Sequence, residues 1–282
     1  MTTPSSIVAV VLFAAFLHAV WNACVKRGSD KFLSSVLVAG GCGVIAVAVL
    51  PFLPQPVGGS WPFIAASVLA QIIYMILLAA TYRAGDMSQT YPLMRGVAPL
   101  LVALVSGPFI GEALTIGRWT GVALISVGVL GMALIIPAKG PRRWAAPGLA
   151  LANACVIATY TVIDGIGVRK SGAPVAYACW IFVLTAIPLV TWAAVRRRHV
   201  FWQYAWTHRS VVVVGGMGTF ASYGLALWAM TRAPVVVVAS LRETSILFAT
   251  AISAFVLKER IVPARLASIG LIAFGAVIIQ SV

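Results

Sequence analysis

Long apolar runs of about 20 residues alternate along the chain with short segments that contain proline, glycine and basic residues. A run of this length fits an α-helix that crosses a bilayer, whereas a transmembrane β-strand would be shorter and alternate in polarity. The runs predict ten transmembrane helices, at residues 5–26, 32–53, 62–82, 88–110, 115–137, 145–168, 174–195, 210–231, 234–257 and 262–281. The expected fold class is therefore an all-α membrane protein.

The chain also contains an internal repeat, in which residues of one type recur 147 positions apart. The matching pairs are Arg95 and Arg242, Glu112 and Glu259, Arg118 and Arg265, and Gly128 and Gly275. They predict two five-helix repeats, at residues 1–138 and 143–282. Because five is odd, the second repeat enters the membrane inverted relative to the first. Such inverted repeats are typical of secondary transporters, whose substrate site lies where the repeats meet.

Composition and charge agree with a membrane protein and exclude a nucleic-acid binder. The chain has 282 residues, of which 61% are hydrophobic and only 9% charged, where a soluble domain would have roughly 25% charged residues. The sequence pI of about 10.4 reflects basic residues in short loops. Odd-numbered loops hold 14 Lys and Arg and even-numbered loops hold 4, which predicts cytoplasmic odd loops and periplasmic termini. The first run has no preceding basic residue, so we expect a retained helix and not a cleaved signal peptide.

Aromatic and hydrogen-bonding side chains inside the spans are the candidates for a substrate cavity. His18, Trp21 and Asn22 share one face of the first helix, because they are spaced i, i+3 and i+4. The same face could instead hold the bundle together through hydrogen bonds between helices. Five further aromatic residues are expected in the cavity wall: Tyr74, Tyr91, Tyr160, Tyr223 and Trp228.

Two arginines lie inside apolar runs, where each costs roughly 3 kcal/mol on insertion scales. Arg95 is surrounded by Pro92, Gly96 and Pro99, which predicts a bent or partly unwound helix; the other is Arg242, next to Glu243. Each arginine could bind a substrate carboxylate or act in a gate. The alternative is that carbonyls or a carboxylate such as Glu243 hold it in a purely architectural role.

Two acids are candidates for proton coupling. Glu243 is the more deeply placed, although Arg242 beside it could keep it ionised. Asp164 lies one turn from the end of its helix, and could be either a proton-carrying carboxylate or a counter-ion for Arg169 or Lys170.

The sequence carries no enzyme signature. It has no phosphate-binding glycine loop with its lysine and no His/Cys metal cluster, so we expect no catalytic residue, no metal and no cofactor. The four cysteines, at positions 24, 42, 155 and 179, are expected to be small buried hydrophobes. Glu112 and Glu259 lie in short loops among Arg118, Lys258 and Arg260, where surface ion pairing is expected.

With these residues in view, nearly the whole chain resembles the drug/metabolite transporter superfamily, in its ten-span EamA-type branch. The segments that carry the resemblance are LHAVWNA at 17–23, YPLMRG at 91–96 with Pro99, LRETS at 241–245, and the acids Glu112 and Glu259. The resemblance implies a ten-helix inverted-repeat bundle in the bacterial inner membrane. It also implies export of amino acids or related small metabolites through a central cavity. The ninth span lacks the interior proline and glycine of the fourth, so a symmetric pair of broken helices is not expected.

The function expected from these observations is export of amino acids, including aromatic ones, by alternating access in a monomer. Two alternatives stay open. One is another cargo, such as cationic drugs or organophosphonates, and the other is a membrane enzyme or a scaffold without transport. Two deep arginines against one or two acids favour zwitterions or anions over cations.

Overall fold

The computed structural model describes residues 4–27, 30–134, 145–255 and 263–281, and these residues form helices and short connections without a β-strand. The α-helices are α1 (Ser5–Arg27), α2 (Lys31–Val49), α3 (Trp61–Ala84), α4 (Met87–Ile110), α5 (Ile116–Leu134), α6 (Ala145–Ser171), α7 (Pro174–Arg196), α8 (Arg198–Thr207), α9 (Gly216–Met230), α10 (Val235–Arg242), α11 (Ser245–Phe255) and α12 (Pro263–Ser281). Short 3₁₀ turns occur at Leu50–Phe52 and Gly58–Ser60, and a π-helical turn at Val211–Gly215 precedes α9.

Ten helical stretches within the described residues are long and apolar enough to cross a membrane. Their bounds agree with the ten predicted spans to within a few residues at most ends, so the all-α membrane fold is confirmed. The eighth span joins the π-helical turn to α9, and the ninth joins α10 to α11. Helix α8 is additional, because the sequence pattern predicted only a loop between spans seven and eight.

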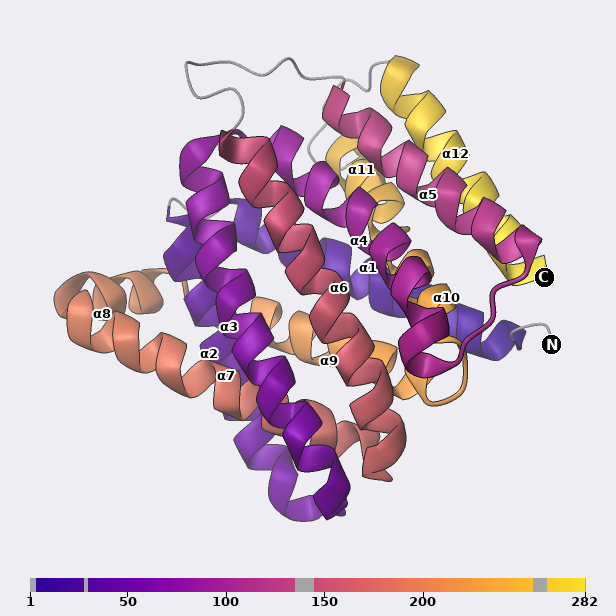
Figure 1. The fold of residues 1–282 in the computed structure, drawn as a ribbon. Coiled ribbons are helices and arrows are strands. Elements are labelled where there is room, and N and C mark those ends of the chain that lie inside the picture. Colours follow the sequence, from indigo (N-terminus) through magenta and orange to yellow (C-terminus); the bar gives the residue numbers. More distant parts are fainter. Residues whose placement is uncertain (1–3, 28–29, 135–144, 256–262, 282) are drawn as a thin grey trace.

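The helices pack in pairs that cross the boundary between the two predicted repeats (Figure 1). Helix α5 lies along α12, and α2 packs against α7. Helix α3 packs against α6, and the corresponding contact in the other half is that of α9 with α1. Helix α4 contacts α6, and the corresponding contact is that of α10 and α11 with α1. Exchanging the first five spans with the last five turns the α5–α12 and α2–α7 pairs into themselves and turns each of the other pairs into another member of the set. This pattern is consistent with the predicted repeat, which stays a prediction.

The contact between α5 and α12 depends on glycines at repeat-related positions. A Cβ atom on Gly128 would come 2.8 Å from the carbonyl oxygen of Ser268, and one on Gly275 would come 2.8 Å from that of Gly121. Because 147 residues separate Gly128 from Gly275 and Gly121 from Ser268, the two close approaches are equivalent. Small residues that let two helix backbones approach closely are typical of helix packing in membranes.

The fourth and ninth spans differ from what their prolines and glycines predicted. Helix α4 is continuous from Met87 to Ile110 although Pro92, Pro99 and Pro108 lie inside it, so of the two expected outcomes around Arg95, a bend or partial unwinding, the unwinding is wrong. The ninth span is the interrupted one. At Glu243 and Thr244 the backbone N–H groups donate to the carbonyls of Ser240 and Leu241, three residues earlier, at 3.0 and 3.1 Å. This tighter turn separates α10 from α11 without any proline.

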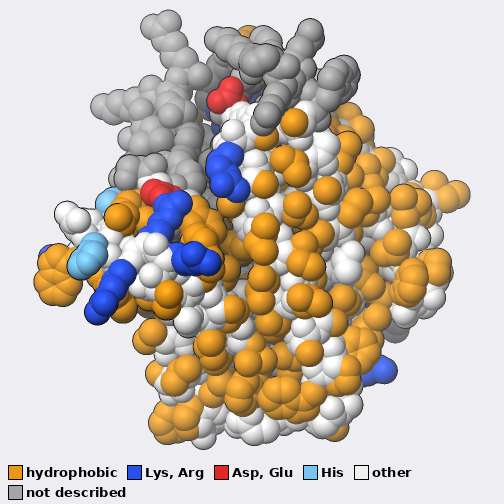
Figure 2. All heavy atoms as spheres, turned by 60° about the vertical axis from the view of Figure 1, so that its left-hand side comes forward, with side chains coloured by type: hydrophobic (Ala, Val, Ile, Leu, Met, Phe, Trp, Pro, Cys, Tyr) orange, Lys and Arg blue, Asp and Glu red, His pale blue; other side chains and the backbone are white. Residues whose placement is uncertain are grey.

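The outer surface of the bundle is largely apolar, as Figure 2 shows on one face. Large hydrophobic side chains such as Phe13, Leu69, Leu104 and Phe274 are exposed on it. A soluble protein rarely exposes contiguous apolar surface of this extent, so this surface fits contact with lipid.

Candidate functional site

A cavity of about 140 Å³ lies inside the bundle, bounded by residues of α1, α2, α3, α4, α6, α7, α9 and α10. At roughly 10–15 Å³ of accessible volume per water, it has room for about ten water molecules. Nine predicted binding residues line it: His18, Trp21, Asn22, Tyr74, Tyr91, Arg95, Tyr160, Tyr223 and Arg242. They come from six helices and from both predicted repeats, so only the tertiary fold brings them together.

The cavity extends from the middle of the bundle toward one of its ends. Its lining residues on α1 lie in the second half of that helix, those on α3 run from its middle at Gln71 to Leu78, and those on α4 lie in the first three turns. On α2 the lining begins at Ser35, on the second turn. These helix ends meet at the α1–α2 and α3–α4 connections, which belong to the basic, odd-numbered loops.

Arg95 forms a buried ion pair with Glu243. Its Nε donates to Glu243 Oε2 at 2.9 Å, and 8% of Arg95 and 4% of Glu243 is exposed. Glu243 is the first residue after α10, so the turn that interrupts the ninth span presents its carboxylate to α4. It lines a small adjoining void with Arg95 and Arg242 and lies outside the lining of the main cavity.

Arg242 forms no ion pair within the described residues, although it is buried and only 9% of its surface is exposed. Its guanidinium carbon lies 5.2 Å from the centre of the Tyr223 ring, a distance typical of a cation–π contact. The hydroxyl of Tyr223 donates to Asp164 Oδ2, and that of Tyr177 donates to Asp164 Oδ1 at 3.1 Å. Asp164 therefore fixes Tyr223, and the Tyr223 ring supports Arg242 at the edge of the cavity.

Several buried polar atoms around the cavity have no hydrogen-bond partner among the described residues. They are Trp21 Nε1, Arg95 Nη2, Thr185 Oγ1 and Thr219 Oγ1, and all four residues line the cavity. Buried polar groups are usually hydrogen-bonded, and each exception needs an explanation. These atoms place unsatisfied hydrogen-bonding groups in the wall of the cavity.

The polar face of α1 lines the cavity and also contacts α4 through Tyr91, so both cavity lining and a contact between helices stay open as its role. Asn22 Nδ2 donates to the His18 carbonyl of its own helix at 3.0 Å, and the rings of His18 and Trp21 meet edge to face at 5.1 Å. One long contact leaves the helix, 3.5 Å between His18 Nε2 and Tyr91 Oη. Across the cavity the rings of Tyr74 and Tyr160 meet edge to face at 6.0 Å.

Residues 144–281 match the model of the EamA-like transporter family. These residues, just under half of the chain, belong to this family. The family is part of the drug/metabolite transporter superfamily, so the chain is a multi-pass membrane transporter of small molecules. No curated protein matches the chain. A crystal structure of another protein matches it at a TM-score of 0.78, over 98% of each chain and with 18% identity, which supports the fold alone.

In this EamA-like transporter, two other predicted site residues, Trp228 and Asp164, are not among the residues that line the cavity. Trp228 lies outside the lining of the cavity, where Arg232 stacks 4.6 Å from its ring centre. Asp164 contacts tyrosines, and the structure shows no ion pair between it and Arg169, so the counter-ion interpretation finds no support. Among the described cysteines Cys42 and Cys179 are buried, whereas Cys155 is exposed, contrary to expectation.

The sequence did not single out some residues that line the cavity. Cys42, Phe182, Thr185 and Thr219 do so, but one small polar or aromatic residue in an apolar helix carries no signal of its orientation. The described residues contain no group of three metal-ligating side chains.

The other end of the transporter is tied together by Glu112 and Arg169. Glu112 Oε1 accepts from Arg169 Nη2 at 2.6 Å and from the Val235 N–H at 2.9 Å. Arg169 also donates to the carbonyls of Met230 and Ala233, at 2.8 and 2.9 Å. Glu112 thus pairs with Arg169 of the other predicted repeat. The sequence had instead suggested ion pairing near Arg118, which lies on α5. Its predicted counterpart Glu259, like Lys258 and Arg260, lies outside the described residues.

Proposed function

We propose that this protein is a secondary transporter that exports amino acids, including aromatic ones, or related small metabolites by alternating access. The observation that carries the proposal is a cavity whose described lining residues include Arg242, a guanidinium without an ion pair in the described part of the chain, and include no carboxylate. Glu243, which lines an adjoining void, is paired with Arg95. The cavity therefore favours a solute that brings its own negative charge.

In the proposed recognition of an amino acid, polar and aromatic groups bind its carboxylate and ammonium groups, and the aromatic wall accepts its side chain. Arg242 would bind the carboxylate, because a guanidinium hydrogen-bonds a carboxylate strongly and with defined geometry. Tyrosine rings would receive the ammonium group through cation–π contacts, and the amide of Asn22 through a hydrogen bond. The same aromatic wall would accept side chains of varied size, including rings.

The two ends of the bundle support alternating access. The cavity lies toward the end with the basic, odd-numbered loops, and the Glu112–Arg169 pair holds the opposite end together. If the odd loops are cytoplasmic, as their charge predicts, this arrangement is open toward the cytoplasm and closed toward the periplasm. We propose the bacterial inner membrane as the location and a monomer as the working unit.

Counterflow in vesicles tests the proposal directly. Purified protein is reconstituted into vesicles loaded with unlabelled L-phenylalanine, and uptake of labelled L-phenylalanine is compared with that of its amide and of phenylethylamine. We expect uptake of the amino acid and much slower uptake of the two cations, because neither offers a carboxylate to Arg242. The control is Arg83→Gln, which replaces an exposed arginine that does not line the cavity. Absence of flux for all twenty amino acids would contradict the proposal.

The main alternative is efflux of cationic drugs or transport of organophosphonates. A phosphonate is an anion, so the unpaired Arg242 supports it as well as a carboxylate, whereas a cation would have to enter a cavity without a lining acid. Counterflow with a labelled aminophosphonate and with a quaternary ammonium dye separates these cargoes.

Proton coupling through Glu243 or Asp164 is part of the proposal, and an imposed pH gradient that drives uphill uptake would support it.

A further inference from the structure

Helix α8 (Arg198–Thr207) connects two membrane spans without crossing the membrane itself. It has 10 residues, so it is about 15 Å long, half the thickness of the hydrocarbon core. The span before it ends at Arg196 and the span after it begins at Val211. Both of its ends therefore lie on the same side of the bilayer, and α8 lies at the membrane surface.

One side of α8 is docked on the bundle and the other carries exposed tryptophans. Phe201 and Tyr204 are buried against α2 and α7, in a cluster that includes Leu33 and Ala193. Trp202 and Trp206, four residues apart and so on one helical face, are 59% and 79% exposed. Tryptophan is enriched where the hydrocarbon core meets the headgroups, because its ring is both apolar and polar.

The same segment is strongly basic. Arg196, Arg198 and Arg209 are exposed and form no ion pair within the described residues, and the stretch from 190 to 215 contains no acid. Figure 2 shows basic side chains and histidines gathered at one end of an otherwise apolar surface. Arginines next to a membrane span attract anionic headgroups, and tryptophans beside them hold the segment at headgroup depth.

We propose that α8 and its flanking arginines form a binding site for anionic phospholipids. Arg196, Arg198 and Arg209 bind the phosphate groups, while Trp202 and Trp206 lie in the interface, where the headgroups meet the hydrocarbon core. This site is separate from the cavity and does not depend on the transported solute.

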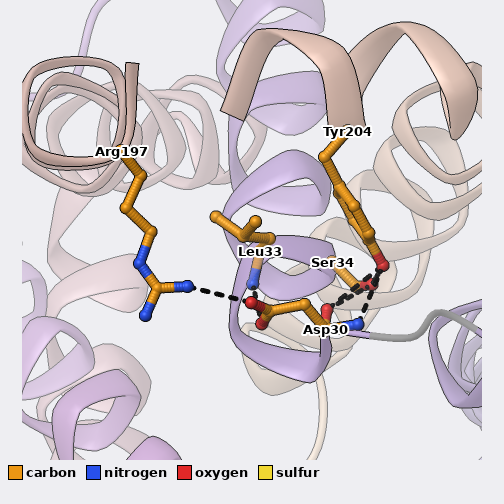
Figure 3. Close-up of polar contacts among 5 residues, drawn as sticks. All are labelled: Asp30, Leu33, Ser34, Arg197 and Tyr204. Atoms are coloured by element: carbon orange, nitrogen blue, oxygen red, sulfur yellow. Dashed lines mark hydrogen bonds and ion pairs between the residues drawn. The ribbon is translucent and has the colours of Figure 1, made fainter. Parts of the chain in front are cut away.

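The contacts of α8 connect this site to the cavity wall (Figure 3). Arg197 Nη1 donates to Asp30 Oδ2 at 2.9 Å, and Asp30 caps the first turn of α2 by accepting from the Leu33 N–H at 3.0 Å. The hydroxyls of Tyr204 and Ser34 are 2.9 Å apart. The next residue, Ser35, lines the cavity. Lipid bound to α8 therefore stabilises the start of a helix that forms the cavity wall.

Native mass spectrometry of the full chain tests the proposal. Detergent-purified protein is incubated with phosphatidylglycerol or with phosphatidylcholine, and bound lipids are counted. The variant is Arg196→Gln/Arg198→Gln/Arg209→Gln, which keeps the Arg197–Asp30 pair. The control is Arg83→Gln/Lys170→Gln/Arg265→Gln, which removes the same charge elsewhere. We expect wild type and control to bind phosphatidylglycerol at least threefold more than phosphatidylcholine, and the α8 variant to lose this preference.

Three results would overturn the proposal. They are an equal loss in both triple variants, an unchanged preference in the α8 variant, and a shift of the α8 variant from dimer to monomer with lipid binding unchanged. The last result would make α8 a protein interface. A second variant, Trp202→Ala/Trp206→Ala, keeps the charge, and we expect it to weaken retention of phosphatidylglycerol when the collision energy is raised. None of these readouts requires transport, so failure here leaves the proposed function untouched.

Discussion

Arg95 and Arg242 occupy equivalent positions in the two predicted repeats, yet their surroundings differ. Arg95 is on an unbroken helix and pairs with Glu243, whereas Arg242 ends a helix and lies over the ring of Tyr223 without an ion pair. The residue equivalent to Glu243 in the first repeat is Gly96, so the carboxylate exists in one copy only. One arginine is thus neutralised within the protein, whereas the other has no ion pair among the described residues, and this difference is the basis for proposing Arg242 as the substrate contact.

The largest expected effect comes from Glu243→Gln, which leaves Arg95 charged and buried without its carboxylate. Breaking a buried ion pair by removing one partner costs about 3–5 kcal/mol. We expect a clearly lower melting temperature in detergent, and substantial recovery in the double variant Arg95→Met/Glu243→Leu, which removes both charges. A single variant as stable as the wild type would show that the pair is not architectural.

Arg242→Gln is expected to have the opposite effect, because it should leave stability nearly unchanged and weaken the binding of the substrate. A hydrogen bond to a charged group contributes about 1.5–3 kcal/mol, which corresponds to a roughly 10–100-fold increase in the concentration needed for half-maximal counterflow. The melting temperature should change far less than in Glu243→Gln. If Arg242→Gln destabilises the protein as much as Glu243→Gln does, the contrast between the two arginines is wrong.

Tyr223→Phe tests whether Asp164 acts on the cavity through Tyr223. The variant keeps the ring under Arg242 but removes one of the two hydroxyls that donate to Asp164, at a cost of about 1–3 kcal/mol in stability. We expect a several-fold loss of counterflow in addition. Tyr177→Phe is the matched control, because it removes the other hydroxyl and does not contact Arg242. Equal losses of counterflow in both variants would argue against a role for Tyr223 in positioning Arg242.

The smallest expected effect is that of Glu112→Gln at the closed end of the bundle. Its partner Arg169 is partly exposed, so the pair contributes about 1 kcal/mol or less. We expect little change in melting temperature but faster labelling of Cys42, which lines the cavity, by a thiol reagent added on that side. The background is Cys24→Ser/Cys155→Ser/Cys179→Ser, and Arg232→Gln on the same side is the control. An unchanged labelling rate would mean that the Glu112–Arg169 pair does not limit access.

Most of the fold could be predicted, because a membrane span needs a long apolar run and each run is visible in the sequence. The ten spans lie close to where the pattern placed them. The interruption of the ninth span could not be predicted in this way. Prolines in α4 leave the helix continuous, and the break at Glu243 has no residue that marks it. Helix α8 was missed because it is too short and too mixed in polarity to resemble a span.

The sequence by itself determined the helical membrane fold, the recurring arginines and the polar and aromatic residues placed among apolar neighbours. Nine of these residues do line one cavity. Only the tertiary structure decided which charge is cancelled. An ion pair between Arg95 and Glu243 joins residues 148 positions apart, and no local pattern encodes such a contact. Whether a buried charge finds a partner depends on a few ångströms of geometry, and here Arg95 has an ion pair whereas Arg242 has none among the described residues.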